Sequence, residues 1–600
     1  MVAGQYGETL RQGWRVLGAG LTGVFMVWGG LHWNALAVSR DDSPRVATAI
    51  AQASSQPTQG ETITIGGTSA AIPWQRRGDR IGLADLSLMQ VLGVDLGNTN
   101  TPTQQPVLWF SETGTPLTTW YANGYRYVDV TDWAARQGWQ LRTTGTALTI
   151  QPPPAQVLAG RRGRQTWGDR LVLDMDRPAL WTLNEDLGQF TLTLHTQTAA
   201  TFSPLALVQA QGNLLRNVEV RQSGNQLIIQ ATYPESARPR VWSLTNPNRV
   251  VIDVRQDDLL PRDIAWAPGV RWQARYVTVG GRAFPVSMLR LRASQGAKAR
   301  PVWANPQSAA GIGSLRDMVR NSGAVAGINA GFFNRNNQLP LGAVRRDGRW
   351  ISGPILNRGA IAWNEQGGAL MNRLFLGYTL TTGEGRNFPV GPINSGYVQA
   401  GIGLYTPDWG SYSPILDNET LVSVSQNRVL RQDPGGAAAS RTTGIPRDGY
   451  LLAVRALSEA VRSLPPGTTL RLTPDLRPAA FEPFPHVIGG GPLLVKDRQV
   501  VLSASTEGFS DAFATQAAPR SAIGLTPEGD MLLVAIHFSP GGRGPTLAET
   551  AQIMLQLGSV DALNLDGGSS SGLMLGGQML NRHPRTIGRI HNAIGVFLGP

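Results

Sequence analysis

The stretch Asn564–Ser571 (Asn-Leu-Asp-Gly-Gly-Ser-Ser-Ser) constrains the fold of this chain most, because it fixes the order of the elements around it. Upstream, Thr546 and Glu549 fit a capping box that predicts the start of a helix, and Gly558 is placed to end it. A strand is expected over residues 560–565. The sequence therefore predicts a helix, a tight turn, a strand and then a glycine-rich polar loop, in which a carboxylate lies beside exposed backbone N–H groups.

Three interpretations of this loop stay open from local sequence. The loop can be a tight turn with a surface aspartate. It can hold a serine nucleophile, because Gly568–Gly572 fits G-x-S-x-G, but that motif needs a following helix, whereas Leu573–Gly577 predicts a short strand and a turn. It can also bind a sugar phosphate, with the Asp566 carboxylate at the reacting carbon and the Gly/Ser backbone and hydroxyls on oxygens.

Five segments, in the right order, resemble the phosphodiester glycosidase family, which includes the lysosomal uncovering enzyme. The resemblance covers roughly residues 270–600, and Asn564–Ser571 is similar to the family's Asn-Leu-Asp-Gly-Gly-Gly-Ser-Ser signature. The other four similar segments are Gly327–Phe333, Ile488–Leu494, Pro519–Gly524 and Arg589–Val596. Residues 270–600 are therefore expected to fold, and to keep activity, alone.

The chain departs from the family pattern at three places. Ser569 replaces the third glycine of the signature, and Ala330 replaces a glycine in the Asn-Gly-Gly-Phe-Phe block. His537–Ser539 stands where many relatives carry Asp-Gly-Arg. An added Cβ at Ser569 or Ala330 is expected to narrow the pocket or to require a changed backbone angle.

The resemblance implies cleavage of a sugar-1-phosphodiester at the anomeric carbon, through an oxocarbenium-like state. It implies two catalytic residues. Asp566 is expected to supply the carboxylate near that carbon, and Arg520 to clamp the phosphate with its planar fork. The signature loop is expected to add donors to the substrate from Gly567, Gly568, Ser569 and Ser570.

Four further residues in the similar segments are expected to bind substrate. The Asn329 amide is placed to contact sugar hydroxyls or an acetamido group, and Phe332 to stack on the sugar. Gly490 lets the backbone approach a ligand, and Asn592 either contacts substrate or orients Asp566. The sequence predicts no metal site and no cofactor, although its spacing leaves the use of a divalent cation open.

Composition indicates a globular, multidomain, turn-rich chain. Six hundred residues are too many for one core, and 71 glycines with 40 prolines favour a β-rich fold. The expected fold class is α+β: a C-terminal mixed sheet with flanking helices, preceded by two small β-rich domains. The absence of cysteine excludes disulfides and cysteine catalysis. A net charge of +12 favours anionic partners, but no nucleic-acid module is recognisable, so no nucleic-acid partner is predicted.

The N-terminus is typical of an exported protein. Arg11 and Arg15 precede an apolar stretch, and Ala35–Ala37 offers a small-x-small cleavage site. Residues 1–38 are therefore expected to be a signal peptide or a membrane anchor, and this segment alone is expected to contact the membrane. Residues 39–61, rich in Ser, Gln, Thr and Asp, predict a flexible linker.

Two β-rich segments precede the C-terminal part. Residues 62–151 resemble the stalk domain named after the N-terminus of copper amine oxidases, with no copper implied. Residues 160–257 resemble AMIN domains, which implies an association with peptidoglycan or related polymers. Residues 261–269 are expected to be the linker to the C-terminal domain.

The sequence thus favours an exported hydrolase of the periplasm or cell envelope. Its expected substrate is a sugar joined through C1 to a phosphodiester in an envelope glycan, a teichoic-acid-like polymer or a glycolipid. One alternative is a non-catalytic envelope protein that binds anionic polysaccharide. Another is a serine phosphodiesterase or esterase, with Ser570 as the nucleophile.

Overall fold

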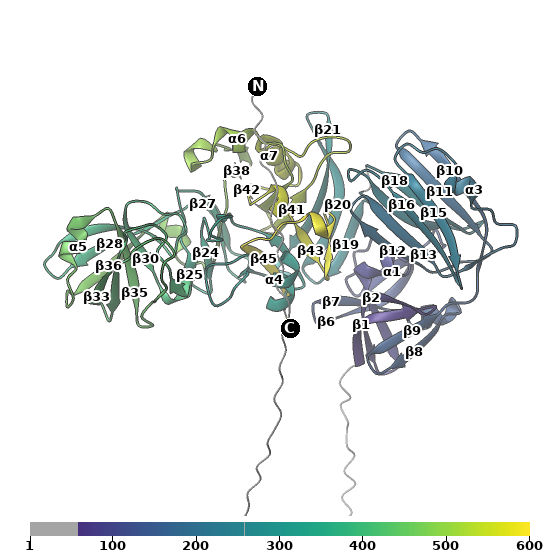
Figure 1. The fold of residues 1–600 in the computed structure, drawn as a ribbon, viewed down its shortest axis with the longest axis horizontal. Helices are drawn as coiled ribbons and strands as arrows, with labels where there is room; N and C mark the ends of the chain where they lie inside the picture. The colour runs from purple at the N-terminus through teal and green to yellow at the C-terminus, as the bar shows by residue number, and fades with distance from the viewer. Residues whose placement is uncertain (1–57, 257–258, 600) are drawn as a thin grey trace, which may run out of the picture. The chain divides into compact units, whose positions relative to one another are not determined.

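The computed structural model describes residues 58–256 and 259–599 (Figure 1). The expected signal segment and most of the expected linker lie outside these residues. The described chain is mainly β, with 49% strand and 12% helix, so the α+β expectation fits only loosely. Within the described ranges, no helix has both the length and the apolar character needed to cross a membrane.

Residues 58–151 form a nine-stranded sheet, called here the N-terminal sheet. Its apolar residues alternate along the strands, which places Ile63, Ile65 and Trp74 in the core. Two short helices belong to this segment, α1 (Leu88–Val91) and α2 (Thr131–Arg136). The strands in spatial order are β4 (Asp95–Leu96), β5 (Gln104–Leu108), β6 (Thr115–Ala122), β7 (Tyr125–Asp129), β3 (Arg80–Ala84), β2 (Thr68–Arg77), β1 (Thr58–Ile65), β9 (Ala147–Gln151) and β8 (Gln140–Thr144).

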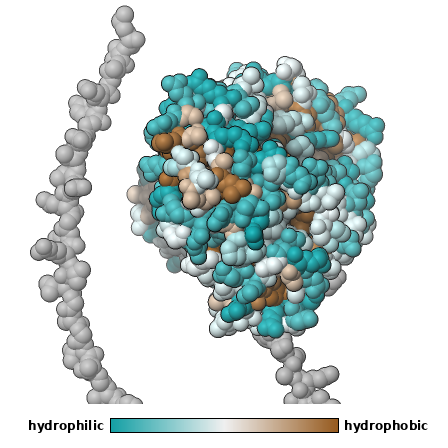
Figure 2. Space-filling view, turned by 90° about the vertical axis from the view of Figure 1, so that its right-hand side faces the viewer, coloured by the Kyte–Doolittle hydropathy of each residue, from teal (hydrophilic) through white to brown (hydrophobic). Residues whose placement is uncertain are grey.

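Residues 156–255 form two further sheets, called here the two-sheet segment, with the short helix α3 (Leu205–Val208). Figure 2 views the molecule from the right-hand side of Figure 1 and shows a mainly hydrophilic surface with separate hydrophobic patches. The five-stranded sheet contains β14 (Gln197–Thr198), β10 (Gln156–Gln165), β11 (Gly168–Met175), β18 (Arg249–Arg255) and β17 (Arg238–Leu244). The four-stranded sheet contains β12 (Trp181–Asp186), β13 (Gln189–Leu194), β16 (Gln226–Thr232) and β15 (Arg216–Ser223).

The C-terminal part is built on an eight-stranded sheet in which every pair of neighbours is antiparallel. A mixed sheet was expected here; instead, four of the seven neighbouring pairs are hairpins, which are antiparallel, and the other three pairs join strands far apart in the chain that also run antiparallel. Helix α7 (Leu547–Gln556) packs Leu547, Ala551 and Met554 into the core of this sheet. The strands in order are β19 (Arg262–Ala267), β20 (Val270–Val279), β21 (Arg282–Leu291), β41 (Met531–Ile536), β40 (Arg520–Leu525), β42 (Asp561–Asn564), β38 (Leu493–Lys496) and β39 (Gln499–Val500).

Two five-stranded sheets complete the framework of the site. The first packs against helix α4 (Leu315–Ser322), whose N-cap is Ser314. It contains β22 (Ala297–Trp303), β45 (Asn592–Leu598), β23 (Ala326–Asn329), β43 (Leu573–Leu575) and β44 (Gln578–Met579). The second contains β25 (Arg349–Ser352), β24 (Val344–Arg346), β37 (His486–Gly489), β26 (Gly359–Trp363) and β27 (Ala369–Arg373). Helix α6 (Asp511–Thr515) lies between β39 and β40 in the chain.

A seven-stranded sheet, with helix α5 (Ser458–Ser463) and the small pair β31 (Ser411–Tyr412) and β34 (Thr443–Gly444), is inserted between β27 and β37. Its β29–β30 pair is parallel, so this sheet alone in the C-terminal part is mixed. Its core contains a buried ion pair between Arg455 and Glu419. The strands in order are β33 (Arg428–Pro434), β32 (Thr420–Ser425), β35 (Gly449–Arg455), β30 (Gly401–Tyr405), β29 (Asn387–Ile393), β28 (Phe375–Thr382) and β36 (Leu470–Arg477).

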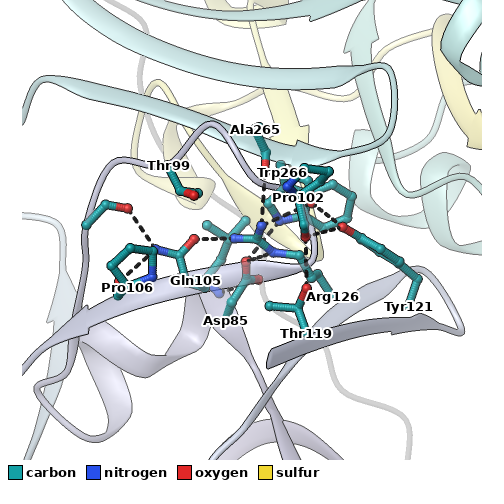
Figure 3. A network of polar contacts seen from close by, with 12 residues as sticks. Asp85, Thr99, Pro102, Gln105, Pro106, Thr119, Tyr121, Arg126, Ala265 and Trp266 are labelled. Atoms are coloured by element: carbon teal, nitrogen blue, oxygen red, sulfur yellow. Dashed lines mark hydrogen bonds and ion pairs between the residues drawn. The ribbon is translucent and has the colours of Figure 1, made fainter. Parts of the chain in front are cut away.

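A buried polar network joins the N-terminal sheet to β19 (Figure 3). The Arg126 Nε donates to Asp85 Oδ2 at 2.7 Å, and these side chains are 0% and 2% exposed. The Trp266 indole N–H of β19 donates to the same carboxylate oxygen at 3.0 Å. The interpretation of residues 261–269 as a linker is therefore wrong, because residues 262–267 form an edge strand that is tied on its other side to the N-terminal sheet.

Candidate functional site

The signature loop has the predicted order of elements. Helix α7 begins with the complete capping box of Thr546 and Glu549, and β42 ends at Asn564. The loop then makes one short 3-10 turn over Gly568–Ser570 before β43. Because a strand and not a helix follows, the loop does not form the nucleophile elbow of a serine hydrolase.

The Asp566 carboxyl group is the central titratable group of the loop. Part of the residue stays open to solvent, yet protein encloses the carboxyl closely enough for desolvation to raise its pKa to about 6. Hydrogen bonds from Ser570 and from the Gly567 N–H, the latter at 3.0 Å, oppose this shift, as do the charges of Arg335 and Arg520. The carboxylate is therefore held in place and is mostly ionised at neutral pH.

Asn329, at the end of β23, holds the signature loop rather than facing solvent. It is fully buried, and its Nδ2 donates to the Asp566 carbonyl oxygen at 2.5 Å. Its Oδ1 accepts from Ser521 Oγ at 2.6 Å and from the Gly572 N–H at 3.0 Å. The Asp566 N–H in turn donates to the Ala330 carbonyl at 2.8 Å. With its amide engaged in this way, Asn329 positions the loop, contrary to the expectation that it reaches sugar hydroxyls.

Arg520, at the start of β40, is also buried, with 1% exposure. Its Nε donates to the Pro545 carbonyl at 3.4 Å, and another guanidinium nitrogen donates to the Gln516 carbonyl. Burial lowers its pKa to about 10, while the Asp566 charge acts in the opposite direction. Arg520 is thus close enough to act on Asp566 electrostatically, but it is tied to backbone carbonyls and does not stand open as the expected phosphate clamp.

Of the other residues predicted from the sequence, some pack against the signature loop or its neighbours and one is exposed to solvent. Gly490 packs on the signature strand, since an added Cβ would lie 2.4 Å from the Asn564 carbonyl oxygen. Asn592 is buried, and its Oδ1 accepts from the Gly331 N–H at 2.7 Å, so it does not orient Asp566 directly. Gly567 approaches the Pro519 carbonyl closely, and Ser570 is buried. Ser569 is exposed.

The two glycine replacements do not strain the backbone. The left-handed position of the loop is Gly568, at φ 61°. Ser569 and Ala330 are not among the residues with positive φ, so a side chain is accommodated at both positions without backbone strain. An added Cβ at Gly568 would meet open space, which leaves the front of the loop accessible.

Phe332 belongs to an aromatic cluster with Phe509 and Phe513. The Phe332 ring centroid lies 5.5 Å from that of Phe509 and 5.9 Å from that of Phe513. The Arg358 guanidinium lies 4.0 Å from the Phe509 centroid, and the Arg520 guanidinium lies 5.3 Å from that of Phe513. Phe332 is half-buried, so it combines packing in this cluster with an open surface.

Three further arginines lie near the signature loop or beside the aromatic cluster. Arg335 is exposed and donates to Ser569 Oγ at 3.4 Å. Arg358 donates to the Glu507 carbonyl at 3.1 Å, and Arg582 donates to the Gly568 carbonyl at 2.9 Å. Arg335 follows the aromatic pair by only two residues, which was an available signal. Arg358 and Arg582 lie outside the similar segments.

Among residues 58–256 and 259–599, no group of three or more His, Asp or Glu side chains is arranged to hold a metal ion. Both ring nitrogens of His591 have local partners. The Nε2 donates to the Ala309 carbonyl at 2.5 Å, and the Nδ1 lies 3.0 Å from the Asn592 amide nitrogen. Burial lowers its pKa to about 4. His591 is therefore a structural side chain behind β45.

Comparison with known proteins gives one family match. Residues 418–597 match the family described as phosphodiester glycosidase. This range contains Arg520 and Asp566, and it begins inside the inserted seven-stranded sheet. A comparison with curated proteins found no match.

Solved structures that are similar to this chain include the following three. A hypothetical protein from Synechocystis is 42% identical over 90% of this chain and 99% of its own, with a TM-score of 0.82. A putative exported protein from Burkholderia pseudomallei K96243 is 19% identical over 70% of this chain and 97% of its own, with a TM-score of 0.44. The zebrafish N-acetylglucosamine-1-phosphodiester alpha-N-acetylglucosaminidase catalytic domain, auto-inhibited by its pro-peptide, is 13% identical over 56% of this chain and 85% of its own, with a TM-score of 0.29. The last two likenesses are too distant to carry an argument.

Proposed function

Because this chain belongs to the phosphodiester glycosidase family and is a hydrolase, we propose that Asp566 is the carboxylate that acts at the anomeric carbon of its substrate. The observation that carries this proposal is the environment of Asp566. The residue keeps an open surface at the end of β42, while burial raises the pKa of its carboxyl group to about 6. Perturbed carboxylates of this kind are typical of reaction centres.

Cleavage of a sugar-1-phosphodiester depends more on an ionised carboxylate than on a general acid. Cleavage of the C1–O bond develops positive charge on the sugar ring, which a nearby carboxylate stabilises as nucleophile or as base for water. The leaving group is a phosphate monoester, which departs as an anion without strong proton donation. The Gly567 N–H and the Ser570 hydroxyl hold the carboxylate through this charge development.

For the phosphate, Arg335 replaces Arg520 as the first candidate. Arg335 is exposed, it acts electrostatically on Asp566, and it contacts the exposed Ser569. A guanidinium in this position can bind two phosphate oxygens, with the Ser569 hydroxyl beside them. Arg358, above the aromatic cluster, is a second cation near Phe332. Buried Arg520 would then act from behind by stabilising the ionised form of Asp566.

As substrate we propose a sugar-1-phosphodiester of an envelope glycan, a teichoic-acid-like polymer or a glycolipid. The net charge of +12 supports an anionic polymer, and the basic and apolar N-terminus supports export to the periplasm or cell envelope. Association with peptidoglycan through residues 160–257 belongs to the same proposal. A polysaccharide-binding protein without turnover is the competing proposal for the same chain.

The test is sugar release from methyl sugar-1-phosphodiesters by the wild-type chain and by Asp566→Asn. We expect Asp566→Asn to keep its fold, by circular dichroism, and much of its binding, but to lose most turnover, because the shape is retained and the charge is lost. Sugar release at the wild-type rate by a folded Asp566→Asn protein would reject Asp566. Binding without any turnover by the wild-type chain would favour the polysaccharide-binding alternative.

Arg335→Ala is expected to raise KM and to lower kcat, because the phosphate is charged in the ground state and in the transition state. The loss in kcat/KM is expected to be about 10- to 100-fold, the size of one lost charge-assisted contact. Arg320→Ala is the matched control, since Arg320 is an exposed arginine on α4 that pairs with Asp317. Unchanged kinetics in Arg335→Ala would remove Arg335 from the phosphate site.

A further inference from the structure

A cavity of about 750 Å³, whose lining does not include Asp566, lies where the two-sheet segment meets the eight-stranded sheet. Its floor is one face of β20 and β21. Trp272, Ala274 and Tyr276 alternate along β20, and Ser287 and Pro285 stand opposite Ala274 and Tyr276 on β21. Side chains at every second position point to the same face of a sheet, so these five residues form a continuous surface.

The walls come from both sides of this junction. The turn Glu185–Gly188, between β12 and β13, faces residues 537–539 and 580–583 of the C-terminal part. Two contacts fix the junction: His583 Nε2 lies 3.2 Å from the Glu185 carbonyl oxygen, and Arg585 pairs with Asp186 at 2.6 Å. The cavity is therefore a feature of the folded chain, enclosed by elements far apart in sequence.

Among the described residues, the lining is amphipathic, and its carboxylates and guanidiniums are equal in number. Exposed apolar side chains, Leu187 and Phe538, stand at its surface, 39% and 44% exposed. The charged lining residues are three carboxylates and three guanidiniums: Glu185, Asp186, Glu235, Arg238, Arg262 and Arg582. The volume lies within the range of about 300–1,000 Å³ that is usual for small-molecule sites.

Three lining residues hold buried side-chain nitrogens that have no hydrogen-bond partner among the described residues. They are Trp272 Nε1, His537 Nε2 and Asn581 Nδ2. A buried polar atom without a partner costs about 1–3 kcal/mol, and such atoms are rare in native proteins. Three of them around one cavity indicate polar partners that are not supplied by the chain itself.

We propose that this cavity binds a short neutral oligosaccharide segment, at a site separate from Asp566. A sugar ring offers an apolar face to Phe538 and Trp272, and its hydroxyls both donate and accept hydrogen bonds. Hydroxyl groups suit the three unpartnered nitrogens, which an acyl chain would leave unsatisfied, and they can also bond to the polar side chains of the walls. The equal numbers of carboxylates and guanidiniums among the described lining residues fit a neutral ligand.

The cavity also touches the back of the signature loop. Arg582 lines the cavity, and its guanidinium donates to the Gly568 carbonyl at 2.9 Å and to the Ser571 carbonyl at 3.4 Å. A glycan segment held here therefore lies next to the residue that supports the loop. This connection to catalysis rests on the proposed function; the binding site itself does not.

Binding is best measured on the full chain carrying Asp566→Asn, so that turnover plays no part. The probes are cellohexaose, chitohexaose and maltohexaose, followed by calorimetry and tryptophan fluorescence. We expect saturable binding of at least one probe. Leu187→Asp, which puts a charge at the rim, and Phe538→Ala, which removes the ring, are each expected to weaken it about ten-fold or more.

Leu205→Asp is the matched control, since Leu205 is an exposed leucine on α3 of the same two-sheet segment, outside the lining. It is expected to leave binding unchanged. The proposal is overturned if none of the three probes binds at millimolar concentration. It is also overturned if both cavity variants are folded and still bind the sugars as the wild type does. A third overturning result is that none of the sugars binds, whereas dodecanoate binds and Leu187→Asp weakens that binding. Sugar release by the wild-type chain is scored separately, so failure of the proposed function leaves these outcomes readable.

Discussion

At the scale of single residues, the chemistry of Asp566 depends on a balance between burial and hydrogen bonding. Desolvation disfavours the charged carboxylate, while Ser570, the Gly567 N–H, Arg335 and Arg520 favour it. Desolvation prevails, so the pKa is raised, but only to about 6. The enclosed carboxylate is thus still ionised at neutral pH and less well solvated than a surface aspartate.

This balance predicts the pH dependence of catalysis. If the ionised carboxylate acts at the anomeric carbon, kcat/KM should rise as the pH is raised through about 6 and level off above it. The measurement is a pH–rate profile of sugar release by the free enzyme at low substrate concentration. A rate that falls as the pH rises through the same range would show that the protonated form is required, and would contradict the proposed role.

The same pKa predicts that Asp566 lowers stability at neutral pH. The folded-state pKa of about 6 lies above the usual aspartate pKa of 3.8, so the folded chain binds the proton more tightly and its stability falls as the pH rises through this window. Asp566→Asn removes the charge. The variant should be more stable than wild type by about 1–3 kcal/mol at pH above 7. The lower part of this range allows for the partial exposure of the residue, because solvent screens its charge. Urea denaturation at a series of pH values measures the difference in unfolding free energy between the variant and the wild type. This difference should vanish below the pKa of Asp566 in the unfolded chain, and an equal difference at all pH values would contradict the prediction.

At the scale of elements, the signature loop is placed by strands from distant parts of the chain. β42 brings in Asp566, β23 supplies Asn329, and β40 supplies Ser521, whose hydroxyl donates to the Asn329 amide. Each contact joins backbone or buried polar atoms, so the loop conformation depends on all three strands being paired in register.

Asn329→Ala should therefore act through the loop. The change removes the hydrogen bonds of Asn329 to the Asp566 carbonyl, the Gly572 N–H and the Ser521 hydroxyl, of which Ser521 keeps its contact with Ser571, at a cost of about 2–4 kcal/mol in unfolding free energy. kcat should fall more than KM rises, because the carboxylate loses its position rather than the substrate losing a contact. Asn336→Ala, at an exposed position, is the control. A rise in KM alone, with normal stability, would show that Asn329 binds substrate after all.

The sequence predicted the elements whose signals are local. The capping box of α7, the strand before Asp566 and the short strand after the loop are all confirmed, because each depends on residues within a few positions. The roles of Arg520 and Asn329 could not be read in this way. Burial is a property of the packed sheets, so a residue in a family block looks the same whether it faces a ligand or supports the loop. Arg358 and Arg582 approach the site only through tertiary contacts.

At the scale of the whole molecule, the N-terminal sheet and the C-terminal part share a core. β19 is the edge strand of the sheet that also contains β40 and β42, and its Trp266 is fully buried against Asp85 and Arg126. A fragment that begins at residue 270 lacks this strand and exposes the edge of β20. We now expect that fragment to be insoluble or inactive, which revises the sequence-based expectation that it works alone. Solubility and sugar release of fragments beginning at residues 58 and 270 would decide.

The Arg126–Asp85 pair gives the sharper test of this coupling. Arg126→Met leaves Asp85 as an unpaired buried charge, and it also removes the donors to Gln105 and to the Trp266 carbonyl. Breaking a buried pair from one side costs about 3–5 kcal/mol, whereas replacing both partners by apolar residues is often close to neutral. We therefore expect thermal unfolding of Arg126→Met to be strongly destabilised and that of Arg126→Met/Asp85→Leu to recover most of the loss. Because the pair is coupled through Trp266 to the sheet that carries Asp566, the single variant should also lose activity at temperatures where wild type stays folded. If Arg126→Met instead has the same Tm as the wild type, the network between the N-terminal sheet and β19 does not contribute measurably to the stability of the C-terminal part, and the proposed coupling is wrong.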